Sequence, residues 1–365
     1  WTFGVERVIA KDYTFNVRYL GTRGVNLFTQ SIINLQPVVT PNRHLPTYLQ
    51  RPSQAELDAL TVTLDDLGND FNNGGFYVPS FLDAGFTNLI FAFPNRGNSV
   101  YHGMATEFTR RFSRGLLFKA AYTWSKNIDD STADLFSTLL SPRRPQDFQN
   151  MQAERARSFL DRTQRFSFTW VYETPWLRSR DNWALRNLAG NWILSGTYIY
   201  ETPQYQTVQS GLDSNMNVDS AGDRAIVNPA GDFDIGSDVS KLTNSAGQVV
   251  GYLADNPNAR WIRAGRGAFA NSGRQLLPLD NINNWDVAVT KKFNITESTS
   301  FEFQASFFNL FNHAQYTAGD VSTVRAVDSR ATRNHLIPGN ALFNDPSRVF
   351  SSHPRNIHFV ARFRF

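Results

Sequence analysis

The stretch Ile357-His358-Phe359-Val360-Ala361-Arg362-Phe363-Arg364-Phe365 closes the chain and alternates apolar with polar side chains. Its odd positions are all apolar, whereas three of its four even positions carry His or Arg. A period of two is typical of a β-strand whose two faces meet different surroundings. The segment therefore predicts a strand with one oily face and one largely charged face.

Eight further segments repeat this alternation. In Phe301–Phe311, for example, Phe301 and Phe303 fall on one face while Glu302 and Gln304 fall on the other. The composition agrees, because the 30 Phe, 12 Tyr and 8 Trp against only 3 Met are residue types that favour strands. The nine predicted strands are Trp1–Ile9, Tyr13–Thr22, Tyr101–Phe112, Leu116–Ser125, Phe166–Glu173, Asn191–Tyr200, Trp285–Phe293, Phe301–Phe311 and Ile357–Phe365.

The connections between these strands alternate between short and long along the whole chain. The short ones cover 10–12, 113–115, 174–190 and 294–298, and the long ones cover 23–100, 126–165, 201–284 and 312–356. Outer-membrane β-barrels show this asymmetry, with short periplasmic turns and longer extracellular loops. No run approaches the roughly 18 apolar residues of a membrane helix, so a membrane crossing would have to use strands.

The sequence thus predicts an all-β fold, namely an antiparallel transmembrane β-barrel fragment with long extracellular loops, as one partial domain over residues 1–365. Bacterial single-chain barrels have an even number of strands. Nine strands that end at a periplasmic Phe365 place Trp1 on the extracellular side, so we expect at least one strand upstream. A nine-stranded piece also leaves two unpaired edges and is not expected to close alone.

Several phrases carry a family resemblance as a set. They are Tyr19–Gly24 (YLGTRG), Phe108–Gly115 (FTRRFSRG), Ala121–Lys126 (AYTWSK), Arg155–Ser158 (RARS), Asp161–Phe166 (DRTQRF), Asn191-Trp192, Asn284–Asp286 (NWD) and Phe307–His313 (FFNLFNH). With them the chain resembles TonB-dependent receptors that have an N-terminal carboxypeptidase-regulatory-like domain, a group abundant in acidobacteria. The resemblance covers almost all of the chain.

The resemblance implies a 22-stranded barrel with a plugged lumen, of which these nine strands are the last. The plug, the TonB box and the regulatory-like domain are not among these 365 residues. The resemblance also implies that the terminal aromatic Phe365 is the signal read by the barrel-assembly machinery. Expected partners are therefore outer-membrane lipid, the protein's own plug domain, the TonB complex, the barrel-assembly machinery and an unidentified solute.

Three functions remain open from the sequence. The first is energy-dependent uptake of an unidentified solute by a TonB-dependent transporter of the bacterial outer membrane. The alternative is a passive porin or a surface-adhesion barrel, and the third is a soluble carbohydrate-binding sandwich. The 36 Lys and Arg are scattered, which argues against a nucleic-acid partner.

No catalytic or cofactor-binding motif is present, so we expect no enzyme activity and no cofactor. The six His are scattered and the chain lacks Cys, so no metal site is expected either. Asp65, Asp66, Asn69 and Asp70 depart from the EF-hand pattern and are interpreted as a solvated loop. Ser53 with Glu56 forms a capping box before Leu57, Leu60 and Leu64. This pattern predicts a short helix in the first long loop.

Two sets of polar or aromatic residues are candidates for solute contact. The candidate ligand contacts of the large loops are Tyr198, Tyr200, Tyr205, Trp261 and Arg263. The candidate lumen-facing residues are Arg18, Glu107, Lys119, Glu173, Glu302, Gln304, Arg362 and Arg364. The second set could line a substrate path or could bond the plug and lumen water, and the latter is favoured because every such barrel needs a polar interior.

Overall fold

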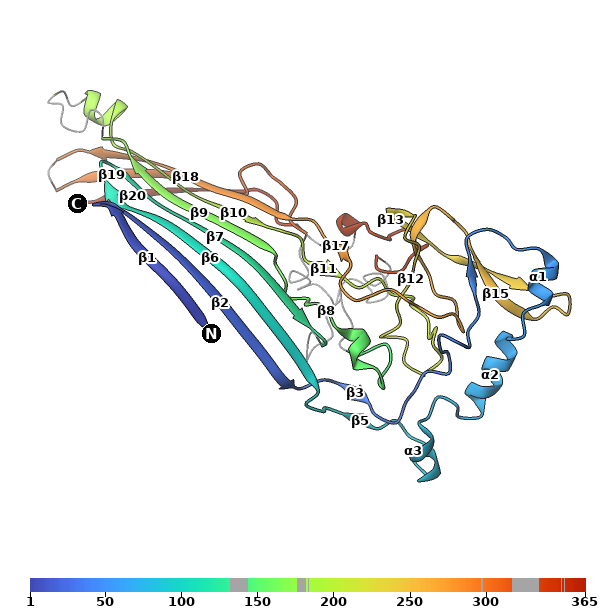
Figure 1. Ribbon diagram of the computed structural model, residues 1–365. Coiled ribbons are helices and arrows are strands. Elements are labelled where there is room, and N and C mark those ends of the chain that lie inside the picture. Colours follow the sequence, from blue (N-terminus) through green and yellow to red (C-terminus); the bar gives the residue numbers. More distant parts are fainter. Residues whose placement is uncertain are drawn as a thin grey trace.

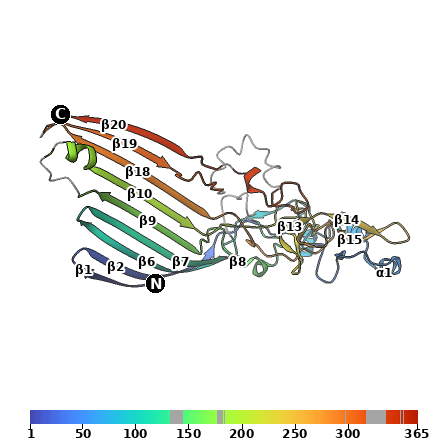
Figure 2. The same ribbon diagram turned by 90° about the horizontal axis from the view of Figure 1, so that it is seen from above.

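Nine long strands form one antiparallel sheet in the computed structural model of the protein (Figures 1 and 2). The structure describes residues 1–131, 144–175, 182, 184–296, 298–316, 335–348, 350 and 352–365. Within these residues the strands pair in chain order, and the short strand β8 (Ala156–Arg157) adds to β7. The nine are β1 (Thr2–Ala10), β2 (Tyr13–Leu27), β6 (Gly97–Ser113), β7 (Leu116–Asp129), β9 (Gln164–Glu173), β10 (Trp192–Glu201), β18 (Ile282–Asn294), β19 (Ser300–Phe308) and β20 (Asn356–Arg364).

One face of this sheet is aromatic and exposed. Residues directly opposite each other on paired strands share a face, and one such row runs through Phe15, Phe108, Ala120, Phe168, Tyr198 and Trp285. On the same face, the relative exposure of Phe3 is 72% and that of Phe359 is 67%. So much exposed apolar surface on one face needs a cover other than water.

The opposite face of the sheet is polar. A neighbouring row across it runs through Asn16, Glu107, Ala121, Ser167, Ile199 and Asn284. Two ion pairs span adjacent strands on this face: Lys119 Nζ lies 2.8 Å from Glu107 Oε2, and Arg362 Nη1 lies 2.7 Å from Glu302 Oε1. The period-two alternation predicted from the sequence is therefore confirmed as two chemically different faces.

Short turns join the strands at one end of the sheet, as predicted. The β6–β7 turn has two residues between its strands, Arg114 and Gly115, with φ of 51° and 83°. Two consecutive residues with positive φ form the turn that matches the twist of paired strands. The connection between β9 and β10 is longer and contains the π-helix η2 (Leu185–Ala189). Beside it, the Lys291 ammonium lies 4.6 Å from the centroid of the Trp192 ring and donates to the carbonyl of Leu188 at 3.1 Å.

The long connections gather at the other end of the sheet and fold into one layer of small elements, which we call the loop layer (Figure 1). Its strands pair as β3–β5, β11–β17, β12–β16–β13 and β14–β15–β4. Their bounds are β3 (Ser31–Ile32), β4 (Thr47–Tyr48), β5 (Phe91–Ala92), β11 (Tyr205–Gln206), β12 (Ile226–Val227), β13 (Asp232–Ser237), β14 (Val239–Thr243), β15 (Val249–Ala254), β16 (Ala259–Ile262) and β17 (Leu277–Pro278). The helices are α1 (Gln54–Asp58), α2 (Leu64–Asn72), α3 (Pro79–Asp83), η1 (Met151–Glu154) and η4 (Pro346–Arg348).

The buried hydrophobic core of the described chain lies in the loop layer and not in the sheet. Its largest cluster joins Val39, Leu45 and Leu67 of the first long connection to Tyr252 and Ala268 of the third. Other clusters bring in Phe148 of the second connection and Phe350 of the fourth. Segments far apart in the sequence therefore exclude water together, which stabilises the layer as a unit.

Three sequence-based expectations need correction. The helix capped by Ser53 ends at Asp58, and Leu64 begins a second helix, α2, because Thr63 and Asp66 form a capping box of their own. The acidic set from Asp65 to Asp70, interpreted as a loop, therefore lies on α2. Strand β19 ends at Phe308 and not at Phe311, because Asn309 adopts a φ of 51°.

Two edges of the sheet are unpaired in the described residues, β1 at one side and β20 at the other (Figure 2). The last strand, β20, ends at the turn end of the sheet, and Phe365 beyond it is 96% exposed. No helix in the described part of the chain combines the length and apolar character needed to cross a membrane.

Candidate functional site

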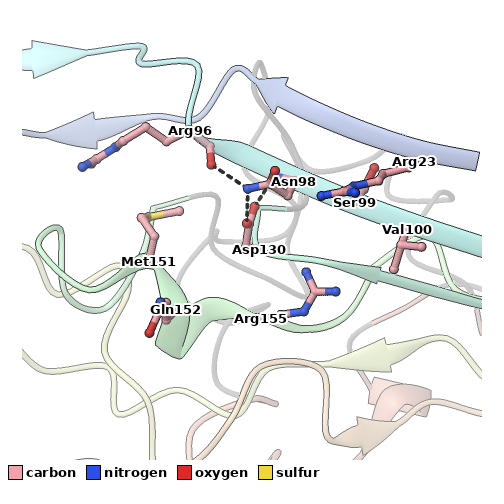
Figure 3. A pocket seen from close by; sticks show the side chains of 9 residues that line it. All are labelled: Arg23, Arg96, Asn98, Ser99, Val100, Asp130, Met151, Gln152 and Arg155. Atoms are coloured by element: carbon pink, nitrogen blue, oxygen red, sulfur yellow. Dashed lines mark hydrogen bonds between the residues drawn. The ribbon is translucent and has the colours of Figure 1, made fainter.

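A pocket of about 860 Å³ lies where the sheet meets the loop layer (Figure 3). The end of β2 contributes Arg23 to its wall, the segment around the start of β6 contributes Arg96 and Asn98, and Asp130 follows the end of β7. The rest of the lining comes from Ser99, Val100, Met151, Gln152 and Arg155. The guanidinium groups of Arg23 and Arg155 and the carboxylate of Asp130 therefore lie around one cavity.

Asp130, the one carboxylate among the described lining residues, already accepts hydrogen bonds from Asn98. Asp130 Oδ1 accepts from the backbone N–H of Asn98 at 2.7 Å, and Asp130 Oδ2 accepts from Asn98 Nδ2 at 3.2 Å. The Asn98 amide also donates to the carbonyl of Arg96 at 3.1 Å. Asp130 thus fastens the start of β6 to the end of β7 and offsets only part of the positive charge.

Two arginines are free to meet a ligand. Figure 3 shows Arg23 and Arg155 on opposite walls of the pocket, and the side chain of neither makes a hydrogen bond or an ion pair with another residue in the described chain. Arg96, in contrast, reaches Ser31 Oγ at 3.5 Å and the carbonyl of Phe148 at 3.4 Å. A planar guanidinium matches carboxylate or phosphate geometry, so the pocket is suited to an acidic group.

A buried network of charges holds the wall behind these arginines. Arg274 Nη2 lies 2.6 Å from Asp129 Oδ1, and Arg274 Nε donates to the carbonyl of Glu154 at 2.7 Å. The carboxylate of Glu154 also pairs with Arg224, and the side chains of all four residues are at most 7% exposed. Burial lowers the pKa of the Arg224 guanidinium, and the negative charge of Glu154 opposes that shift. Because Asp129 and Glu154 directly precede Asp130 and Arg155, the network fixes two lining residues.

The comparison with protein families agrees with a sheet that has one aromatic face and one polar face. A family model described as an outer membrane beta barrel domain matches residues 1–335. The chain belongs to this outer membrane β-barrel family. It therefore lies in the bacterial outer membrane, where lipid covers the aromatic face of the sheet.

Solved structures give more distant matches to this outer membrane β-barrel chain. The outer membrane transporter YddB from Escherichia coli aligns with 99% of this chain and 32% of its own, at 8% identity and a TM-score of 0.41. The pyoverdine outer membrane receptor FpvA from Pseudomonas aeruginosa PAO1, bound to pyoverdine, aligns with 100% and 29%, at 11% identity and a TM-score of 0.38. The chain thus spans about a third of the length of these structures. No curated protein matches it.

The eight candidate lumen-facing residues share one face of the β-barrel sheet. Arg18 lies directly opposite Ala105, Glu173 opposite Ile193, and Gln304 opposite Val360 on the paired strands. The register places these three and the other five candidates on the polar face of the sheet. Four of the eight form the two cross-strand ion pairs described above. Gln304 also lines a hollow of about 350 Å³ on this face. That the face lines a lumen stays a prediction.

The five candidate loop contacts are not brought together. Trp261 is 1% exposed and donates its indole N–H to the carbonyl of Phe233 at 2.8 Å. It is a core residue, which corrects its interpretation as a ligand contact. Tyr198 and Tyr200 lie within β10 on the aromatic face, and Tyr198 stacks on Trp285. Both positions fall inside the strand predicted over 191–200, and their contact with a solute stays a prediction.

The remaining two candidates hold the loop layer together. The Arg157 guanidinium lies 3.8 Å from the centroid of the Tyr205 ring, on β11. Arg263 donates through Nε to the carbonyl of Ser210 at 2.9 Å and pairs with Asp238 at 3.2 Å. The Tyr205 ring and the Arg263 guanidinium thus already have partners within the loop layer.

The pocket arginines were missed as site residues by the sequence analysis. Arg23 and Arg155 stand inside two of the family phrases, but nothing in the sequence shows that the two phrases meet in space. The available signal is that Arg23 opens the first long connection and that Arg155 lies within the second. In the described part of the chain, no three His, Cys, Asp or Glu side chains gather as a metal site.

Proposed function

We propose that the chain is part of the barrel wall and the outer loops of a TonB-dependent transporter that takes up an acidic solute. The single observation that carries the acidic solute is the pocket with Arg23 and Arg155 unpaired on opposite walls. Its position at the loop end of the sheet suits first capture of a solute at the cell surface, if that end is extracellular as the loop lengths indicate. Dependence on TonB is supported by the family phrases of the sequence.

Other parts of the proposal extend the same assignment. The role is transport or reception and not catalysis. The plug domain, the TonB complex and the barrel-assembly machinery are the proposed protein partners, with Phe365 in the assembly signal. The two unpaired edges of the sheet favour further strands, because unsatisfied backbone groups are costly in lipid.

Uptake by cells that produce the whole protein tests energy coupling. Cells with and without TonB are given labelled anionic, neutral and cationic glycans and peptides, and the accumulated label is measured. We expect uptake of an anionic probe only in cells that have TonB. Equal uptake in both strains would favour the passive porin, and surface binding without any uptake would favour the adhesion barrel.

Substitution of the two free arginines tests the pocket itself. The double variant Arg23→Gln and Arg155→Gln removes two charged donors, each worth about 1.5–3 kcal/mol to a bound anion. We expect at least about ten-fold weaker binding of the anionic probe, measured by titration on cells.

The matched control for the pocket is Arg51→Gln. Arg51 is an exposed arginine of the first long connection that does not line the pocket. Its loss should leave binding unchanged. Equal binding by the double variant and the wild type would rule out the pocket as the capture site, while the uptake assay would still report on TonB independently.

A further inference from the structure

A second feature lies in the third long connection, in the segment from Asp213 to Asp223. Its sequence DSNMNVDSAGD places an acid or an amide at 213, 215, 217 and 219, and a further acid at 223. None of these residues lines the arginine pocket. Side-chain oxygens that recur at alternate positions of one loop are typical of calcium-binding loops.

Hydrogen bonds fold this segment onto itself. Asp213 accepts from the backbone N–H of Asn217 at 2.9 Å. Asp223 Oδ2 accepts from the backbone N–H groups of Ser214 at 2.5 Å and Asn215 at 3.5 Å. Residues nine positions apart are therefore held side by side, which closes the two ends of the loop against each other.

Four side-chain oxygens of the loop are buried without a hydrogen-bond partner in the described chain. They are Ser214 Oγ, Asn215 Oδ1, Asp219 Oδ2 and Asp223 Oδ1. Asn215 and Asp219 are each 6% exposed, and Ser214 and Asp223 are each 0% exposed. An unpaired buried acceptor costs about 1–3 kcal/mol, and more when it is charged, so these oxygens are suited to a ligand that carries positive charge.

The charges around the loop do not balance. Among the described residues, the carboxylates of the loop form one ion pair, that of Asp219 Oδ1 with Arg144 Nη2 at 2.8 Å, which leaves an excess of negative charge in the described chain. Burial raises the pKa of Asp223 well above its usual value, and the charge of Asp213 adds to that rise. Asp213 and Asp219 therefore both act on Asp223 as like charges.

We propose that the loop from Asp213 to Asp223 binds one calcium ion through the free oxygens of Asn215, Asp219 and Asp223. Calcium prefers oxygen ligands in flexible geometry, and carboxylates, amide oxygens and backbone carbonyls all serve. Two of the three side chains are carboxylates and one is an amide. The site is independent of solute uptake and lies beyond the proposed function.

The loop differs from an EF-hand in ways that set its affinity. Counted from Asp213, positions 1, 3 and 5 carry Asp, Asn and Asn, as that pattern allows, but position 12 is Arg224 where the EF-hand has its bidentate Glu. Position 6 is Val218, with a φ of 72°, where the EF-hand has Gly. Weak binding follows, in the range of about 10⁻⁴–10⁻³ M that extracellular calcium modules show.

A bound ion would fix the loop layer at a central point. Asn215 and Asn217 both donate to the carbonyl of Gln146, at 2.7 and 3.2 Å, which joins the third connection to the second. Between them Met216 is fully buried in the main hydrophobic cluster. The ion would thus stabilise the contact between the second and third connections and the buried position of Met216.

Calorimetric titration of the whole protein in detergent with calcium chloride, after treatment with EGTA, tests the site. We expect one ion per chain and much weaker binding of magnesium. Asp223→Asn and Asp219→Asn should each weaken calcium binding at least about ten-fold. Asp65→Asn, an exposed acid on α2, should leave the affinity unchanged.

Thermal unfolding gives a second readout, in which Asp223→Asn should change the Tm in opposite directions without and with calcium. Without calcium, Asp223→Asn should raise the Tm of the loop layer because it removes a buried repelled charge, and it should abolish the rise in Tm that calcium gives the wild type. Asp219→Asn serves if Asp223→Asn does not fold. Absence of any calcium response up to about 10 mM, or unchanged calcium affinity in both variants, would overturn the proposal.

Discussion

At the residue scale, the buried pairs of Glu154 decide how rigid the pocket wall is. Glu154 meets Arg224 and Arg274 in a site that water does not reach. Breaking a buried ion pair by removing one partner costs about 3–5 kcal/mol, because the remaining charges stay buried and uncompensated. The pocket therefore depends on a residue that does not face it.

Glu154→Gln should destabilise the loop layer by about 3–5 kcal/mol. The measurement is hydrogen exchange of backbone amides in residues 144–163 and 222–275, which should become faster. Asp65→Asn is the control, since Asp65 is exposed on α2. Unchanged exchange in the Glu154 variant would show that the network contributes little to stability.

His335 makes the loop layer sensitive to acid. The ring is fully buried, contacts the amide oxygen of Gln206 and packs edge-on to Phe350, with 5.1 Å between ring centroids. Burial lowers the pKa of His335 to about 4, although the charge of Asp345 opposes the shift. The neutral ring is thus the form that the fold accepts.

The sign of the pH effect follows from that lowered pKa. Above pH 6.5, the value of an ordinary His, the full contribution of the neutral ring is present, and it is lost as the pH falls toward about 4. The loss amounts to about 3 kcal/mol. Protease resistance of the loop layer at pH 7 and pH 4.5 measures it. His335→Gln should reduce the difference between the two pH values, and an identical difference in that variant would contradict the assignment.

At the element scale, alternation alone predicted the nine strands of the sheet and their order. It underestimated their length at the loop end: β6 begins at Gly97 and not at Tyr101, and β7 continues to Asp129 beyond Ser125. The physical reason is that polar residues occupy both faces there, as at Asn98 and Asn127, so the alternation stops before the strand does. Strand pairing needs only backbone groups.

The loop layer and the pocket could not be predicted in the same way. Strands β3 and β5 have two residues each and pair across a separation of about sixty residues in the chain, too short for a periodic signal. Trp261 illustrates the difficulty, because a Trp in a long connection is equally compatible with a surface contact and with a core. The second helix, α2, could have been found, since Thr63 and Asp66 repeat the capping pattern of Ser53 and Glu56.

The β6–β7 turn gives a prediction for the sheet. A Cβ on Gly115 would lie 2.2 Å from the carbonyl oxygen of Glu173, and the φ of 83° is unfavourable for any other residue. Gly115→Ala should lower the free energy of unfolding by about 1–3 kcal/mol. Gel mobility of unheated samples across a urea series measures the folded fraction.

The control for that substitution is Gly68→Ala. Gly68 lies in α2 with open space around its missing Cβ, so Ala there should be neutral or stabilise the helix by about 0.5–1 kcal/mol. If Gly115→Ala unfolds at the same urea concentration as Gly68→Ala, the turn tolerates more displacement than its geometry indicates.

At the scale of the whole molecule, the sheet and the loop layer are stabilised by different means. Strand β10 pairs over its full length with Ile282–Lys291 of β18, so the connection between them is not needed to align them. The layer, in contrast, depends on apolar contacts among the connections, such as those of Leu45 and Leu67 with Ala268.

Replacement of residues 205–278 by a short Gly/Ser linker separates the two contributions. The sheet should still assemble, as shown by the gel mobility of unheated samples, while the first connection should become sensitive to added protease because its core partners are gone. Loss of both properties would mean that the loop layer is required for the strands to assemble.

The shared core of the loop layer has a consequence for how such a surface changes over generations. Residues of the first, second, third and fourth connections exclude water together, so an altered apolar residue in one connection calls for compensation in another. Exchange of a single loop between relatives would leave apolar side chains without partners. New solute preferences should therefore arise by substitutions at the pocket rim, or by inheritance of all the connections as a set.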